Sequence, residues 1–310
     1  MSGQVAAGVA AAAGRAVAAL RPVGGGDIND AFAVAFEDGG EAFVKTRADA
    51  APGEYATEAA GLEWLASADG APRVPRVLAV HDPADERAGG EGGPACAGNA
   101  GRRLLVLEWI AGGRLGPAGE EALGHGLASL HAAGAPAFGT LAPGARPPLR
   151  IGPLELPADT RETWAVLYAE QRLAPLLGPA RHSGALSAGG ARAVEAVCER
   201  MGELAGPSET PARLHGDLWS GNVMADAHGA PVLIDPAAHG GHREVDLAML
   251  ALFGGARPRM LAAYDEALPL AAGHDERVEL WQLFPLLVHA VLFGGSYGVA
   301  AERIARRLAG

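Results

Sequence analysis

Cysteine and clustered positive charge are both scarce in this sequence. The 310 residues include two cysteines, Cys96 and Cys198, and neither lies in a CxxC or Cys/His spacing. This scarcity predicts neither a zinc site nor a disulfide framework, and it favours a reducing cytoplasm as the location. The formal net charge is -11, and no basic run occurs. Because nucleic-acid binding needs clustered Lys and Arg that displace counterions from phosphates, we expect no nucleic-acid partner.

Long apolar runs are absent as well. The stretch VAAGVAAAAGRAVAAL, residues 5–20, is similar to the apolar part of a signal peptide. However, no Lys or Arg precedes it, alanine is only weakly apolar, and the run is too short to span a bilayer. We therefore expect no membrane association, and we predict a short Ala-rich helix that leads into a strand.

The composition is that of a globular protein, with 49% hydrophobic and 20% charged residues. Strand-like patterns dominate residues 16–108, where the turn Asp38-Gly39-Gly40 joins two strands and a helix follows over 53–68. Past residue 114 the patterns are helical, apart from a short strand in PVLID. The helices are predicted within residues 119–134, 160–177, 189–204, 256–268 and 275–298.

These patterns predict an α+β protein with two lobes. A small sheet-plus-helix lobe is expected over residues 1–107, a hinge over 108–113, and a larger, mainly helical lobe over 114–310.

The polar stretch LHGDLWSGN, residues 214–222, carries the first chemical signal. Asp217 and Asn222 have the spacing by which phosphoryl-transfer enzymes combine a proton-accepting carboxylate with a metal-binding amide oxygen. Asp235, at the end of an apolar strand, would be a second ligand, and Mg²⁺ favours such hard oxygen atoms. The same spacing also occurs in ordinary turns and helix caps, so its interpretation depends on further elements in the right order.

Two such elements are predicted to contact nucleotide phosphates. Gly24, Gly25 and Gly26 in GGGDIND suit a turn that approaches phosphates closely, although the spacing GxGxxG is missing and most Gly-rich turns are only turns. Lys45, in the strand AFVKT, can reach phosphates, and Glu58 on the following helix can pair with it. Taken alone, either side chain would be interpreted as a solvated surface residue.

A further element is the apolar strand LVLEWI, which ends in AGG. Backbone groups around Glu108 and Ile110 can hydrogen-bond an adenine if this stretch is the hinge between the lobes. The alternative is a core strand that enters a loop.

The sequence resembles the protein-kinase-like superfamily and, within it, the fructosamine kinase (ketosamine kinase) family. The resemblance spans nearly the whole chain and is most specific at Trp219, Ser220 and the later GHRE. A generic aminoglycoside or choline phosphotransferase shares HGDxxxxN and a later Asp, but not these residues. The matching stretches are GGDIND (25–30), EAAGLEWL (58–65), YAEQRLAPLL (168–177), LHGDLWSGN (214–222), LIDPA (233–237), GHREVDLAM (241–249) and LFGG (252–255 and 292–295).

The resemblance implies roles for the matching residues. Asp217 is the implied catalytic base, and Asn222 and Asp235 are the implied Mg²⁺ ligands. Lys45 and Glu58 form the implied phosphate-positioning pair, beneath a nucleotide-covering loop that contains the three glycines.

Four other residues are assigned to the acceptor side or to the support of the loop. Trp219 is expected to border the acceptor pocket, although core packing accounts for it equally well. His289 falls where the family has a polar helix, and it either faces the acceptor or is a buried core histidine. Asp246 and His215 are interpreted as structural supports of the catalytic loop.

No regulatory loop is expected. Protein kinases hold a phosphorylated activation loop with an Arg before the catalytic Asp, and here Gly216 takes that position. Pro236 follows Asp235 in place of the Phe of DFG-type enzymes, and the ten residues between Asp235 and Asp246 are too few for such a loop.

The leading hypothesis is an ATP- and Mg²⁺-dependent kinase for the 3-hydroxyl of ketosamines on glycated lysine or small amines, which leads to deglycation. Ribulosamines, erythrulosamines and fructosamines remain open, because residues 140–162 depart from the Asn-rich segment usual in the family. An aminoglycoside- or choline-type phosphotransferase and a nucleotide-binding pseudokinase are the alternatives. A monomer or a homodimer is expected.

Overall fold

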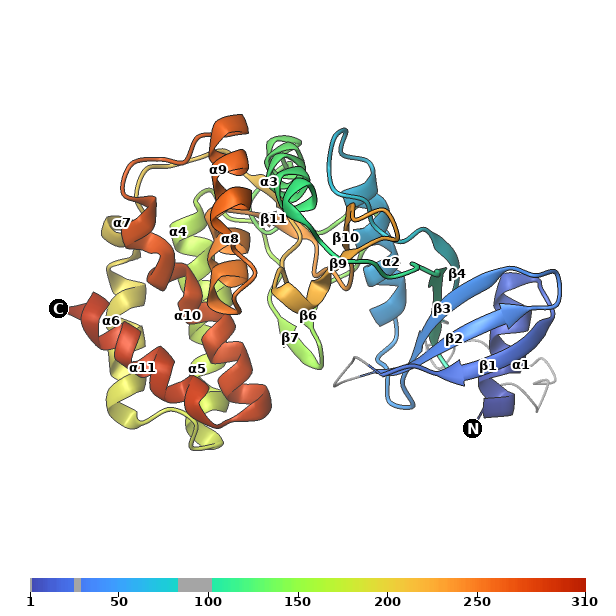
Figure 1. Ribbon diagram of the computed structural model, residues 1–310. Coiled ribbons are helices and arrows are strands. Elements are labelled where there is room, and N and C mark those ends of the chain that lie inside the picture. Colours follow the sequence, from blue (N-terminus) through green and yellow to red (C-terminus); the bar gives the residue numbers. More distant parts are fainter. Residues whose placement is uncertain (1, 25–28, 83–101) are drawn as a thin grey trace.

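A small sheet-based lobe and a larger helical lobe make up the chain (Figure 1). The computed structural model describes residues 2–24, 29–82 and 102–310. The predicted α+β architecture with two lobes is confirmed. No helix within these residues is long and apolar enough to cross a membrane.

The small lobe contains a five-stranded antiparallel sheet in the order β1-β2-β3-β5-β4. The predicted turn joins β2 and β3, and its Gly39 has a φ of 86°, which glycine adopts without steric cost. The strands are β1 (Val17–Pro22), β2 (Asp30–Phe36), β3 (Glu41–Thr46), β4 (Val77–His81) and β5 (Leu104–Glu108).

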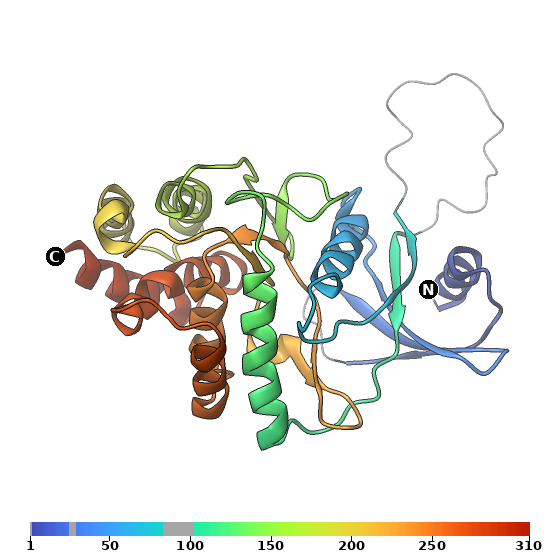
Figure 2. The same ribbon diagram turned by 90° about the horizontal axis from the view of Figure 1, so that it is seen from above.

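Two helices, α1 (Ser2–Ala13) and α2 (Glu54–Ala66), cover opposite faces of this sheet (Figure 2). In β5, Leu104 and Val106 join the core beneath α1, whereas Leu105 and Leu107 join the core beneath α2. Side chains alternate along a strand, so Val44 on the α1 side leaves the next residue, Lys45, on the α2 side. The pairing of strand and helix therefore brings Lys45 toward α2.

The large lobe consists mainly of helices. The long helix predicted near residues 160–177 is a succession of two α-helical segments with a π-helical segment between them, and it begins after Thr163, whose side chain caps Val166 N. Neither α8 nor α11 is predicted from the sequence. The helices are α3 (Pro117–Ala132), α4 (Trp164–Leu167), η1 (Tyr168–Leu173), α5 (Ala174–His182), α6 (Ala188–Glu199), α7 (Met201–Leu204), α8 (Glu244–Leu252), α9 (Pro258–Ala267), α10 (His274–Phe293) and α11 (Ser296–Ala309).

Three short antiparallel strand pairs accompany these helices. One of them, β6–β7, projects between the two lobes (Figure 1). The pairs are β6 (Leu149–Ile151) with β7 (Leu154–Leu156), β8 (Ala212–Leu214) with β11 (His239–Gly241), and β9 (Val223–Ala225) with β10 (Pro231–Leu233).

The GHRE residues stabilise the large lobe from within. Arg243 binds Glu209 with two nitrogen–oxygen distances of 2.8 Å, and Glu244 accepts hydrogen bonds from Arg277 and from Trp281 Nε1. Glu209, Glu244 and His242 lie close enough together to hold a metal ion. Because arginines already compensate both carboxylates, this group is explained by packing between α8 and α10.

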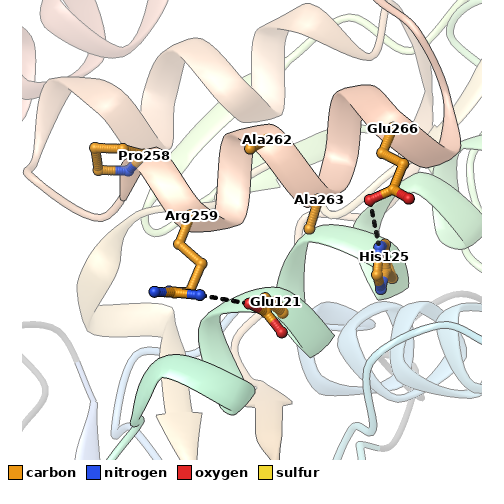
Figure 3. Close-up of a pocket in the computed structure, with 7 residues that line it drawn as sticks. All are labelled: Glu121, His125, Pro258, Arg259, Ala262, Ala263 and Glu266. Carbon is orange, nitrogen blue, oxygen red and sulfur yellow. Dashed lines mark hydrogen bonds and ion pairs between the residues drawn. The ribbon is translucent and has the colours of Figure 1, made fainter.

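Helices α3 and α9 pack closely side by side (Figure 3). At their surface Arg259 binds Glu121, with a nitrogen–oxygen distance of 2.6 Å. Deeper in the interface, a Cβ on Gly124 would lie 2.2 Å from the carbonyl oxygen of Met260. Glycine is therefore required at this position of α3.

We expect Gly124→Ala to lower the free energy of unfolding by about 2 kcal/mol, because the added methyl group forces α3 away from α9. Gly202→Ala, in α7, is a matched control: nothing lies within 4 Å of its added Cβ, and alanine forms helices better than glycine. Thermal denaturation checks both variants. A melting temperature of Gly124→Ala equal to that of the control would contradict the tight packing.

Candidate active site between the lobes

The predicted site residues meet in a cleft of about 760 Å³ between the lobes. Lys45 and Glu58 line it from the small lobe, and Asp217, Asn222 and Asp235 line it from the large lobe. The hollow at α3 and α9 in Figure 3 contains none of these residues. The cleft is therefore the candidate active site.

The catalytic loop follows β8 and ends in the 3-10 turn η2 (Ser220–Asn222). Asn222 Nδ2 donates to the backbone oxygen of Asp217 at 2.8 Å and to Asp217 Oδ2 at 3.2 Å. Gly216 has a φ of 81°, and a Cβ on it would lie 2.1 Å from the carbonyl oxygen of Ala237. The loop thus requires glycine where protein kinases place an arginine.

Asp246, at the start of α8, holds the backbone of this loop through hydrogen bonds. Its buried carboxylate accepts hydrogen bonds from the backbone N–H groups of His215 and Gly216 at 2.7 and 3.0 Å. The His215 ring lies 2.9 Å from the carbonyl oxygen of Ile234 and accepts a hydrogen bond from Asp217 N. Both residues lie where structural supports are expected, and neither lines the cleft.

Lys45 connects the two lobes. Its Nζ atom lies 2.9 Å from both carboxylate oxygens of Glu58 and 3.0 Å from Asp235 Oδ1. Burial alone would lower the pKa of Lys45, but the charges of Glu58 and Asp235 outweigh it and raise that pKa, so the amine stays protonated. One cation therefore joins a small-lobe helix to the loop after β10.

Asp217 carries an unusual carboxyl group. Burial and the nearby charge of Asp235 raise its pKa to about 7, although the hydrogen bond from Asn222 acts in the opposite direction. The two carboxylates thus repel one another across a site in which only Lys45 compensates them among the described residues. A divalent cation would relieve this repulsion.

The donor atoms fit Mg²⁺. Asn222 uses its nitrogen on Asp217, which leaves its Oδ1 atom available, and the Asp235 side chain is 42% exposed. One amide oxygen and one carboxylate are the hard ligands that Mg²⁺ takes when phosphate oxygens and water complete its shell. Asn222 and Asp235 are thus the residues that could hold the ion.

The nucleotide side of the cleft is only partly described. Gly24 lines the cleft, whereas Gly25 and Gly26 lie outside the described residues. Glu108 and Ile110 also line it, but the Glu108 N–H donates to the carbonyl oxygen of Arg76, so it is not free for an adenine. Trp109, between them, lines the cleft too and was missed by sequence reasoning, since the strand pattern ends there.

Aromatic rings line the opposite side. We define the acceptor wall as the cleft-lining residues of β6–β7, the catalytic-loop tryptophan, the end of α8, and helices α10 and α11. These are Leu149, Arg150, Ile151, Gly152, Trp219, Phe253, Val288, His289, Leu292, Phe293 and Tyr297.

Both predicted acceptor-side residues belong to this wall. Trp219 is 37% exposed and packs edge-on against Phe253, so it is not a core residue. The ring of His289 contacts Phe253, Phe293 and Tyr297. Burial lowers the pKa of His289, which is therefore neutral at pH 7.

Arg150, Phe253 and Tyr297 were missed by sequence reasoning. The LFGG repeat was a signal for Phe253, since each copy lies at the end of a helix and its phenylalanine, Phe253 or Phe293, lines the cleft.

Comparisons with known proteins agree with this geometry. The fructosamine kinase family model matches residues 1–309. A "probable ketoamine kinase" of Synechocystis sp. is 35% identical over 289 residues, which cover 93% of this chain and 89% of that protein. The crystal structure of a protein from Thermobifida fusca assigned as a fructosamine-3-kinase has a TM-score of 0.84 and 42% identity, over 98% of both chains.

More distant structures share the fold alone. An aminoglycoside phosphotransferase has a TM-score of 0.61 at 17% identity, over 99% of this chain and 97% of its own. This likeness confirms the predicted protein-kinase-like fold.

We expect Asp246→Asn to cost about 1–3 kcal/mol of stability, because its amide nitrogen would face an N–H donor and leave buried polar groups unsatisfied. Asp226→Asn is the control, since the oxygen of the new amide can still accept hydrogen bonds from the N–H groups of His228 and Ala230. Urea denaturation of both variants measures the difference. Equal unfolding midpoints would show that Asp246 does not support the loop.

Proposed function

The chain belongs to the fructosamine kinase family, and from this premise we propose that it transfers the γ-phosphoryl group of ATP to the 3-hydroxyl of a ketosamine, with Mg²⁺ bound. The family makes it a phosphotransferase with an alcohol acceptor. Glycated lysines and ketosamines of small amines are the proposed acceptors. Their 3-phosphates are unstable, so the reaction would lead to deglycation and protein repair.

Asp217 is the proposed catalytic base. In the transfer, the acceptor hydroxyl loses its proton to the Asp217 carboxylate as its oxygen bonds to phosphorus and the bond to ADP breaks. Asn222 Nδ2 holds the carboxylate through Asp217 Oδ2 and the backbone through the Asp217 carbonyl oxygen, and Asp246 also holds the backbone of the loop. The base is therefore oriented before the acceptor binds.

Lys45 and Glu58 are proposed to position the nucleotide phosphates, beneath the loop of Gly24, Gly25 and Gly26. Mg²⁺, held by Asn222 and Asp235, would neutralise charge that develops on the phosphate oxygens. The backbone near Glu108 and Ile110 is proposed to contact the adenine, through groups other than the Glu108 N–H.

The observation that carries this proposal is the chain of contacts from Glu58 through Lys45 to Asp235, beside Asp217 and Asn222. A pseudokinase would have no need to keep a base, two oxygen ligands and a buried, doubly paired lysine together. Gly216, Pro236 and the short connection to Asp246 leave no room for an activation loop, which supports a permanently assembled enzyme.

The chemistry of the acceptor wall favours a ketosamine over a cationic drug. Among its described residues no carboxylate is present, whereas a polycationic aminoglycoside or choline would be expected to need negative charge or a dedicated cage. Flat rings such as Trp219 and Phe253 instead suit the carbon chain of a sugar. Trp219 and His289 are the proposed acceptor contacts. The protein is also proposed to be cytoplasmic and to be a monomer or a homodimer.

Activity assays test the function directly. We expect phosphate transfer from ATP to ribulose-lysine or fructose-lysine, and none to an aminoglycoside or choline. Asp217→Asn, which keeps the shape of the side chain, should lower kcat at least about 100-fold because the proton acceptor is lost. Chelation of Mg²⁺ should abolish the transfer.

Asp226→Asn, on an exposed turn, is the matched control and should retain full activity. Transfer only to the drug or choline would refute the ketosamine assignment. ATP binding without transfer to any acceptor would indicate a pseudokinase instead.

A further inference from the structure

The acceptor wall contains one charged group that the proposed chemistry does not use. Among its described residues only Arg150 is charged at pH 7. It lies on β6, which pairs with β7 in a short hairpin. The arginine therefore reaches the cleft from an element that carries none of Asp217, Asn222 and Asp235.

The hairpin holds Arg150 in a defined position. Its neighbours Leu149 and Ile151 are buried in the large-lobe core, so the alternation of β6 leaves Arg150 on the other face. Its Nη1 atom donates to Glu155 Oε1 across the hairpin at 2.5 Å, and its side chain is 17% exposed. Within the described part of the chain, Nε and Nη2 have no hydrogen-bond partner. Two donor atoms thus remain for a ligand.

We propose that Arg150 is a specificity-determining residue, which makes the enzyme favour ketosamines whose amine part carries a carboxylate over those of uncharged amines. A guanidinium binds a carboxylate through paired N–H donors and stays charged at any physiological pH. This inference rests on the proposed function. Because Asp217 binds the reacting hydroxyl from a different element, Arg150 is assigned to the end of the acceptor away from the sugar.

Matched acceptors test this assignment. The ribulosamines of 4-aminobutanoate and 6-aminohexanoate are compared with those of the corresponding carboxamides, which have the same shape without the charge. We expect kcat/KM for each carboxylate to exceed that for its carboxamide by about tenfold. This ratio corresponds to the free energy that a charge-assisted hydrogen bond contributes. The difference should lie mainly in KM, because the contact is remote from the reacting hydroxyl.

Three variants identify the source of the preference. Arg150→Gln should reduce the ratio to about one while it retains turnover of the carboxamides. Glu155→Gln should raise the ratio, since it removes the carboxylate that competes for Arg150. Arg161→Gln is the matched control. Arg161 is likewise paired with a glutamate, Glu170, but it does not line the cleft, so the ratio of kcat/KM for carboxylate over carboxamide should not change in this variant.

The outcomes separate this inference from the proposed function. Equal kcat/KM for carboxylate and carboxamide in the natural protein, or a preference that survives in Arg150→Gln, overturns the role of Arg150 alone. Turnover of none of these ribulosamines, although ribulose-lysine or fructose-lysine is phosphorylated, overturns the specificity assignment alone. Turnover of no ketosamine at all overturns the proposed function, and the specificity assignment with it.

An independent observation concerns lysine itself. Lys45 is the only lysine in the chain, and the remaining 24 of its 25 basic residues are arginine. Lys45 is 5% exposed and is enclosed by Glu58 and Asp235. The surface of the folded chain therefore offers a reducing sugar no ε-amino group.

We infer that the folded protein does not acquire on its own lysine the modification that its family acts on. A ketosamine forms when a free amine adds to a sugar aldehyde, loses water to give a Schiff base, and rearranges. A guanidinium remains protonated and does not enter this step. Exclusion of the sugar from the buried ε-amine of Lys45 therefore protects the one lysine side chain.

Incubation with ribose in the absence of ATP, followed by peptide mass mapping, tests this inference. We expect no adduct on Lys45 in the folded protein and an adduct once urea unfolds it. Arg192→Lys places one amine on the exposed surface of α6 and should gain an adduct there without unfolding. Modification of Lys45 in the folded protein as fast as that of the introduced lysine would overturn the inference.

Discussion

The placement of one buried cation determines the arrangement of the whole cleft. Lys45 lies at the boundary between the lobes, and a charge in that position persists only if carboxylates surround it. Glu58 supplies the first from α2, and Asp235 supplies the second from the large lobe. The ion triad thus joins the two lobes beside a core cluster that α2 and β5 share with α3, α8 and α9. The alternation of β3 and the packing of α2 on β5 contribute to the geometry of the triad.

Two aspartates of the large lobe, Asp246 and Asp217, have different surroundings. Asp246 lies below the catalytic loop, where backbone N–H groups satisfy it, and the same burial that favours those hydrogen bonds excludes it from substrate. Asp217 lines the cleft, and burial together with the like charge of Asp235 raises its pKa, although Asn222 donates a hydrogen bond to it. Similar side chains therefore differ in role because their backbone surroundings differ.

Sequence reasoning identified residues that regular elements bring into the cleft, while their chemical roles stay proposals. Lys45 and Glu58 were identified on a strand and the helix after it, and Asp217 and Asn222 by their spacing. Arg150 was missed because the three-residue strands β6 and β7 are too short to show a periodicity. Tyr297 was missed because one helix was predicted to run through Gly294 and Gly295, whereas α10 ends at Phe293 and α11 begins at Ser296. The hydrogen bond from the Glu108 N–H to the carbonyl oxygen of Arg76 was missed as well. It joins the end of β5 to the residue before β4, and no local pattern in either stretch shows it.

The two sides of the cleft differ in how strongly their residues depend on one another. On the ionic side, Lys45 pairs with both Glu58 and Asp235, and Asp235 raises the pKa of Asp217, so a substitution of one residue disturbs several partners at once. The acceptor wall consists of rings, aliphatic side chains and one arginine on a short hairpin, and its members depend on each other mainly through packing. A substitution in the hairpin is therefore expected to alter the shape and charge of the acceptor wall without disturbing the triad around Lys45.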